Sequence, residues 1–89
     1  MASSKDDAWD EANAAYSRGD YATAMPGMKL FAERGDENAQ HNLGLMYLRG
    51  EGVEQSDTEA AVWFQKAAEG GNAKAQFELG VLFEEGKGR

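Results

Sequence analysis

The side chains that could carry chemistry are few and scattered along this chain. His41 is the only histidine among 89 residues, there is no cysteine, and Glu37 stands one helical turn before His41. Zinc and related metals take three or four such ligands from the protein. One imidazole beside one carboxylate therefore predicts no metal centre, and we interpret His41 as a surface or groove residue.

Other catalytic arrangements find no support either. The sequence offers no convincing Ser-His-Asp or Cys-His spacing, and the acidic pairs Asp6-Asp7 and Glu84-Glu85 fall at predicted helix ends, where solvation explains them. The segment Gly50-Glu51-Gly52 follows a predicted helix and lacks the lysine of a phosphate-binding loop. We therefore expect that the chain is not an enzyme and binds no cofactor. An enzymatic or metal-binding role is kept as the remote alternative.

Charge and composition narrow the class of partner. The formal net charge is −7, and because nucleic-acid binding depends on clustered Lys and Arg, we expect no nucleic-acid partner. No apolar run approaches the roughly 20 residues of a membrane span, and the N-terminal residues do not resemble a signal peptide. The sequence predicts a soluble domain and does not identify its compartment: the cytoplasm, or the periplasm or extracellular space if a signal peptide was removed, all fit.

An internal repeat organises the chain. The segment Ala39–Gly52, AQHNLGLMYLRGEG, recurs at Ala75–Gly88 as AQFELGVLFEEGKG, a shift of 36 residues (75 − 39). Periods of 20 to 50 residues are typical of stacked helical repeats. Residues 8–19 align without gaps onto residues 39–50, as a divergent third copy. The positions that define the repeat are Ala39, Leu43, Gly44, Tyr47, Gly50, Gly52, Ala60, Trp63, Gly71, Ala75, Leu79, Gly80, Phe83, Gly86 and Gly88.

Apolar spacing predicts that each copy is a helix. Ala39, Leu43, Met46 and Tyr47 recur at the i, i+4, i+7 and i+8 positions that share one side of a helix. Turn residues divide the rest of the chain into further helices, and Ser56 with Glu59 forms a predicted capping box. The predicted helices span approximately residues 5–18, 21–34, 37–49, 57–69 and 73–85.

Four residues stand out inside these helices. A glycine within a helix costs about 0.5–1 kcal/mol relative to alanine, so we interpret Gly44 and Gly80 as glycine notches, places where a neighbouring helix approaches closely. Asn13 replaces the glycine in the divergent copy, which predicts a looser contact there. Pro26 lies inside the second predicted helix and predicts a kink or a ragged first turn.

These motifs carry a resemblance to a known family. The pattern A-Q-x-x-L-G-x-x-Y/F-x-x-G-x-G, a loop, and then A-A-V-W-F-x-K-A-A-E resembles the Sel-one-like repeat of the tetratricopeptide superfamily over residues 36–89, and residues 8–35 resemble it more weakly. The resemblance implies an all-α right-handed superhelix of five antiparallel helices. Its single domain, 1–89, would hold repeats at about 5–35 and 36–71 and a partial repeat at 72–89.

The resemblance also implies a role as an adaptor or scaffold that binds a peptide or helix of a partner protein in a concave groove. A helical wheel places six residues, the predicted groove residues, on the face that lines this groove in the family. The predicted edges of the groove are Asp10, Arg18, Glu84 and Glu85. The alternative for Leu45 and Phe77 is that they cover one another. A second alternative for the whole chain is a purely structural segment of a longer solenoid. The predicted groove residues are His41, Leu45, Leu48, Arg49, Phe77 and Val81.

The C-terminal copy has no partner helix after Gly88 in this sequence. Since terminal repeats normally present a polar outer side, the apolar residues Phe77, Val81 and Leu82 are expected to be partly uncovered. A longer array, a homodimer, or simple tolerance of the exposure would each account for this. We favour a chain cut from a longer array, with self-association through the incomplete repeat as its practical consequence.

Overall fold

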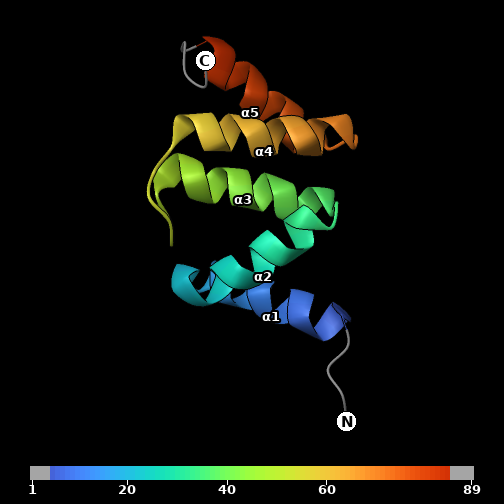
Figure 1. Cartoon of the computed structure of the whole chain (residues 1–89), viewed down its shortest axis with the longest axis vertical. Coiled ribbons are helices and arrows are strands. Elements are labelled where there is room, and N and C mark those ends of the chain that lie inside the picture. Colours follow the sequence, from blue (N-terminus) through green and yellow to red (C-terminus); the bar gives the residue numbers. More distant parts are fainter. Residues whose placement is uncertain (1–4, 85–89) are drawn as a thin grey trace.

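The computed structural model describes residues 5–84, and side chains from residue 8 onward (Figure 1). This part of the chain contains helices and no strand, which confirms the all-α prediction. The predicted helix ends agree with the observed ones to within one residue. The helices are α1 (Lys5–Ser17), α2 (Tyr21–Glu33), α3 (Glu37–Arg49), α4 (Asp57–Glu69) and α5 (Ala73–Glu84).

The helices stack in chain order along the long axis of the molecule. Each helix packs against the next one in the sequence, and the chain runs back and forth through the stack (Figure 1). The described chain measures 48 × 25 × 17 Å along its principal axes. A molecule in which each unit contacts mainly its neighbours is a helical-repeat solenoid.

Two turns show the repeat in their hydrogen bonds. The Asp36 carboxylate accepts from the backbone N–H of Ala39 at 3.0 Å, and 36 residues later the Asn72 side chain accepts from the N–H of Ala75 at 2.8 Å. Both caps follow a glycine in the left-handed region, with φ of 98° and 97°. The two turns therefore end one helix and begin the next in the same way.

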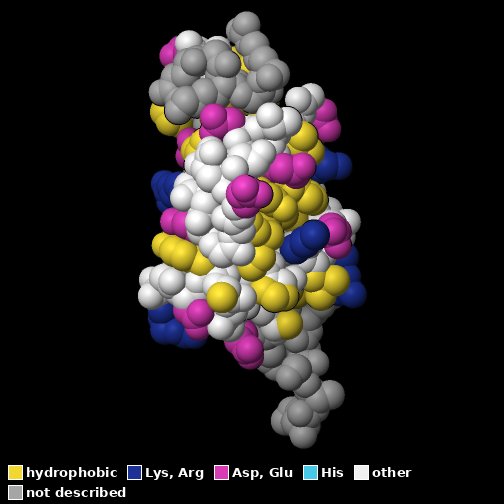
Figure 2. All heavy atoms as spheres, turned by 60° about the vertical axis from the view of Figure 1, so that its left-hand side comes forward, with side chains coloured by type: hydrophobic (Ala, Val, Ile, Leu, Met, Phe, Trp, Pro, Cys, Tyr) yellow, Lys and Arg dark blue, Asp and Glu magenta, His cyan; other side chains and the backbone are white. Residues whose placement is uncertain are grey.

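The core consists of two clusters of buried residues. Tyr47 packs against both clusters, and it therefore ties the two halves of the stack together. The first cluster contains the buried residues Ala12, Ala15, Ala24, Met28, Phe31, Ala32, Ala39, Leu43 and Met46. The second contains Ala60, Ala61, Phe64, Ala67, Ala75 and Leu82. On the face in Figure 2, hydrophobic side chains reach the surface along the middle, interrupted by charged side chains.

The two glycine notches have different surroundings. A Cβ built on Gly44 would lie 2.6 Å from two ring atoms of Phe64, so the ring of α4 sits directly on the α3 backbone as expected. A Cβ on Gly80 would meet no described atom within 4 Å. The prediction of a close contact is thus confirmed at Gly44 and wrong at Gly80, because no described helix covers that side of α5.

The contact between α1 and α2 contains a close approach that was not predicted from the sequence. A Cβ on Gly27 would lie 2.8 Å from the Cβ of Ala12, so these helices approach closely at Gly27, on the second helix of the pair. The looser contact at Asn13 stays a prediction. The helix α2 continues through Pro26, which is exposed. Its first turn is capped by Asp20, whose side chain accepts from the N–H of Thr23 at 3.4 Å, so the expected ragged start is not observed.

The loop between α3 and α4 begins with Gly50 in the left-handed conformation, φ 70°, as predicted. The predicted capping box forms only in part: the Ser56 hydroxyl accepts from the N–H of Glu59 at 3.1 Å. The N–H of Ser56 instead donates to the carbonyl of Tyr47 at 2.9 Å. Since that donor already has a backbone partner, Glu59 has no capping role.

The same loop packs back onto α1 and α2. The Tyr16 hydroxyl donates to the Glu51 carboxylate at 3.3 Å, and a Cβ on Gly52 would lie 2.8 Å from the carbonyl oxygen of Tyr21. Burial and the neighbouring Glu51 carboxylate raise the pKa of Tyr16 to about 12. Gly52 is required where the loop approaches the Tyr21 carbonyl, because a side chain would collide there and because its φ is +75°. The predicted features at Glu85, Gly86 and Gly88 lie outside the described residues.

Candidate functional site

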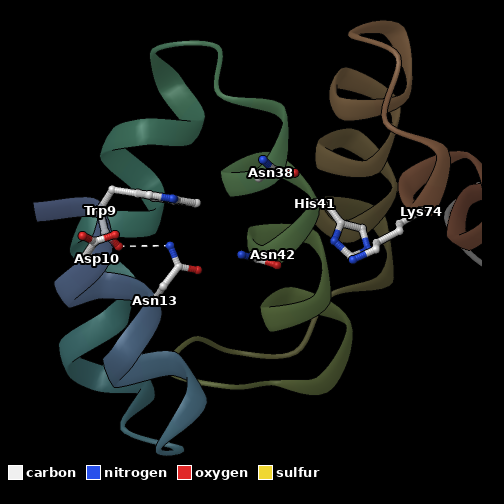
Figure 3. A pocket seen from close by; sticks show the side chains of 7 residues that line it. All are labelled: Trp9, Asp10, Asn13, Asn38, His41, Asn42 and Lys74. Atoms are coloured by element: carbon white, nitrogen blue, oxygen red, sulfur yellow. Dashed lines mark hydrogen bonds between the residues drawn. The ribbon is translucent and has the colours of Figure 1, made fainter. Parts of the chain in front are cut away.

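A hollow of about 410 Å³ lies on the side of the stack formed by α1, α3 and α5 (Figure 3). These are the first helices of the three successive helix units, so the repeat architecture itself places them along one surface. The lining is mainly polar. The residues that line this hollow are Trp9, Asp10, Asn13, Asn38, His41, Asn42 and Lys74.

The α1 wall is held by packing and by a local hydrogen bond. The Trp9 ring meets Phe31 of α2 edge to face, with ring centroids 5.4 Å apart and an interplanar angle of 75°. The Asn13 amide donates to the Trp9 carbonyl at 3.0 Å (Figure 3). Asp10 is exposed, so its carboxylate is the accessible charge on this wall.

The opposite wall is formed by His41 and Lys74, which lie beside each other in Figure 3. His41 is only 8% exposed, and its Nε2 atom has no hydrogen-bond partner among the described residues. The nearest carboxylate oxygen, Oε2 of Glu78, lies 3.9 Å from Nε2. Burial lowers the pKa of His41, with Glu78 opposing the shift and Lys74 adding to it. His41 is therefore neutral at neutral pH, and Lys74 supplies the positive charge of this wall.

Amide side chains lie between the two walls. Asn38 and Asn42 project from α3 between the α1 residues and His41 (Figure 3). The side-chain Oδ1 atom of Asn38 accepts from the Asn72 side-chain amide at 3.3 Å, which links the hollow to the turn before α5. Each asparagine amide offers two N–H donors and one carbonyl acceptor. The hollow can therefore pair with both polar groups of a peptide backbone.

The structure places only one of the six predicted groove residues in this hollow. That residue is His41, and Asp10 from the predicted edge joins it there. Leu45 and Leu48 are half-buried and pack against the second core cluster.

The other predicted residues lie elsewhere. Val81 is half-buried, whereas Arg49 and Glu84 are exposed. Phe77 is 71% exposed on α5, whereas the expectation that Leu82 is partly uncovered is wrong, because its side chain is buried in the second core cluster. Arg18 is exposed and lies 3.7 Å from the Asp20 carboxylate. Whether any of these residues contacts a partner stays a prediction.

His41 and Asp10 were predicted at the groove but the other five lining residues were not, because the helical wheel placed the groove around Leu45, Leu48 and Phe77. A usable signal was present: Asn38, His41 and Asn42 follow i, i+3 and i+4 spacing, which puts three polar groups on one helix side. Lys74 occupies the position of Asn38 one repeat later (38 + 36). A search for polar residues at helical spacing on the first helix of each unit would have found them.

The described residues contain no group of three or more His, Asp or Glu side chains that could hold a metal ion. Among the helices of residues 5–84, none is both long and apolar enough to cross a membrane.

The stacked helix pairs and the hollow along their first helices define a helical-repeat protein. The chain belongs to the Sel1 repeat family, because the family model described as Sel1 repeat matches residues 38–72 and 73–89. Sel1 repeats generally mediate protein–protein interaction and are non-catalytic modules. The resemblance found in the motifs is thereby confirmed.

Two curated proteins illustrate the relationship. Over 73 residues the chain is 32% identical to the ERAD-associated E3 ubiquitin-protein ligase component HRD3A of Arabidopsis thaliana, covering 81% of this chain. Over 54 residues it is 41% identical to the DAP3-binding cell death enhancer 1 of Rattus norvegicus, covering 61% of this chain. Each match spans 11% of the relative's length.

Proposed function

We propose that this chain is a protein-binding module that holds a segment of a partner protein in the hollow between α1, α3 and α5. The observation that carries the proposal is the position of the hollow, since side chains from all three first helices converge on it. A surface assembled from successive repeats contacts a partner over several turns of chain.

The lining indicates what kind of segment fits. Asparagine amides at the centre pair with backbone groups, and the Trp9 ring offers a flat apolar surface. Asp10 on one wall and Lys74 on the other give the hollow opposite charges at its two sides. The proposed ligand is therefore a polar peptide or helix with a basic residue near Asp10 and an acidic residue near Lys74.

Charge reversal at both walls tests the proposal. Both residues are exposed, so the double variant D10K/K74E is expected to fold as the wild type does. The matched control K29E carries the same Lys-to-Glu change as K74E on an exposed lysine of α2, outside the hollow. Wild type, D10K/K74E and K29E are each immobilised as bait, and the captured proteins are quantified by mass spectrometry.

We expect a set of proteins that wild type and K29E retain equally and that D10K/K74E retains about tenfold less, because reversed charges repel the matching partner groups. Binding of a peptide from such a protein is then mapped by amide chemical shifts, with changes expected at Asn38, His41 and Asn42. A capture profile that is identical for all three baits would contradict the proposal and favour a purely structural segment of a solenoid.

A further inference from the structure

The outward side of α5 carries a row of residues that no other element of residues 5–84 covers, and we call this row the α5 stripe. All of its members are exposed, and Phe77 and Phe83 are 71% and 45% exposed. Their positions follow the three- and four-residue spacing that lines one side of a helix. The α5 stripe consists of Ala73, Gln76, Phe77, Gly80, Phe83 and Glu84.

The same row exists one repeat earlier, where another helix covers it. Subtracting 36 from each position gives the equivalent row of α3, and all of its members are buried or half-buried. At Gly44 the covering element is α4, which runs antiparallel to α3 (Figure 1) and places the ring of Phe64 on the glycine. The equivalent row consists of Glu37, Gln40, His41, Gly44, Tyr47 and Leu48. The molecule therefore shows what covers such a row: an antiparallel helix that presents an aromatic ring to the glycine.

One difference between the two rows indicates the occupant. Where α3 has His41, α5 has Phe77, so the α5 stripe contains both the glycine notch and an exposed aromatic ring. It can supply both halves of the ring-on-glycine contact that α3 and α4 make together. Such a surface is self-complementary, as a two-fold symmetric interface requires.

We propose that the α5 stripe docks against the α5 stripe of a second copy of this chain, with the two helices antiparallel and Phe77 of each copy on Gly80 of the other. In this antiparallel register, any two residues that face each other across the interface have numbers that add up to 157, as Phe77 and Gly80 do (77 + 80). Ala73 of one copy then faces Glu84 of the other (73 + 84). The two-fold axis passes between Phe77 and Gly80.

The charges on and after α5 are compatible with a contact between two copies of the chain. Residues 73–89 contain three basic and three acidic residues, so they add nothing to the net charge of −7 that otherwise repels two copies. The antiparallel register also brings each Glu84 carboxylate to the first turn of the partner's α5. A negative side chain is favourable there, because the N-terminal end of a helix carries partial positive charge.

Oligomeric state tests the interface, measured by sedimentation equilibrium over a wide concentration range. The variant G80L fills the notch, yet it should fold because no described atom lies within 4 Å of a Cβ at that position. F77D removes the ring and adds charge. L30D is the matched control, since Leu30 is an exposed hydrophobic residue of α2, 44% exposed.

We expect wild type and L30D to form dimers with the same dissociation constant. G80L and F77D should each raise that constant about tenfold or more. A wild type that stays monomeric at the highest concentration would overturn the proposal and leave the stripe to a helix of another protein. A dimer that persists unchanged in both stripe variants, or one that L30D also abolishes, would overturn it equally.

The relative direction of the helices has its own test, which uses the absence of native cysteine. In the double variant A73C/E84C the two thiols of one copy lie about 16 Å apart along the helix, since 11 residues rise 1.5 Å each, and they cannot bridge each other. After oxidation, peptide mapping should find position 73 of one copy linked to position 84 of the other. Links of 73 to 73 and 84 to 84 would indicate parallel helices and contradict the register.

Discussion

The helices α3 and α5 carry nearly the same motif in different surroundings. In α3 the sequence A-Q-x-x-L-G is covered by α4, with the ring of Phe64 against Gly44. The same motif occurs in α5, but there Gly80 is exposed and no described atom lies within 4 Å of a Cβ built on it. The comparison teaches that the motif specifies a helix prepared for a covering partner, and that the partner itself must come from elsewhere in the chain or from another molecule.

Removing the Phe64 ring, which fills the notch at Gly44, should have the largest effect on stability. Phe64 is completely buried, and replacing a buried Phe by Ala typically costs about 3–5 kcal/mol. F64A is therefore expected to lower the free energy of unfolding by about this amount, measured by urea denaturation with circular dichroism. The control F83A removes a half-exposed ring of α5, and equal losses in the two variants would argue against a filled notch in α3.

Alanine at the two glycine positions should act in opposite directions. At Gly44 the new methyl group meets the Phe64 ring, with an overpacking cost of about 1–3 kcal/mol that exceeds the gain in helix propensity of about 0.5–1 kcal/mol. At Gly80 only the gain applies, so G80A should stabilise the monomer by about 0.5–1 kcal/mol. Urea midpoints measured on dilute samples check the pair, and the same sign for both variants would break the comparison.

Two equivalent glutamines extend the comparison to hydrogen bonds. Gln40 is buried and donates to the Ala32 carbonyl at 3.1 Å, whereas Gln76 is exposed and donates to the Ala68 carbonyl at 3.3 Å. Q40A should cost about 1 kcal/mol, the usual net worth of a hydrogen bond. In dilute samples, where the monomer predominates, Q76A should stay within about 0.5 kcal/mol of wild type, as exposed substitutions do. A larger loss for Q76A under these conditions would mean that Gln76 is covered even in the monomer.

The smallest expected effect concerns pH and His41. Burial holds the pKa of this imidazole below its ordinary 6.5, so below pH 6.5 the unfolded chain binds a proton that the folded chain does not. Stability should therefore fall as the pH drops from 6.5 toward the lowered pKa, and it is unaffected by this group above 6.5. Unfolding curves of wild type and H41Q across this range measure the effect, which H41Q should remove. A wild-type curve that matches H41Q would show that His41 is solvated.

The sequence was sufficient for the fold because local signals and periodicity agreed. Asp36, Asn72 and Gly50 act at the predicted turns, and helix ends were correct to within a residue. The notch at Gly80 was predicted by analogy alone, and analogy cannot say whether a covering helix exists. Gly27 was overlooked because its close neighbour, Ala12, belongs to another helix that sequence spacing does not reveal.

The hollow was harder to predict than the fold. Leu45 and Leu48 were predicted as groove residues; both are half-buried and pack against the second core cluster, and their contact with a partner stays a prediction. A helical wheel shows which residues lie opposite the main apolar face, but it does not show that a neighbouring repeat covers part of that side. The polar residues at the hollow became recognisable only when α1, α3 and α5 were placed beside one another.

The most direct test of the account is amide hydrogen exchange on the wild-type chain, compared for residues 43–47 of α3 and 79–83 of α5. If α3 is a covered helix and α5 is the same helix uncovered, the α3 amides should exchange only on global unfolding. In a dilute sample the α5 amides should exchange through easier local opening, and they should gain protection as the protein concentration rises. Equal protection of the two segments in the dilute sample would contradict the account.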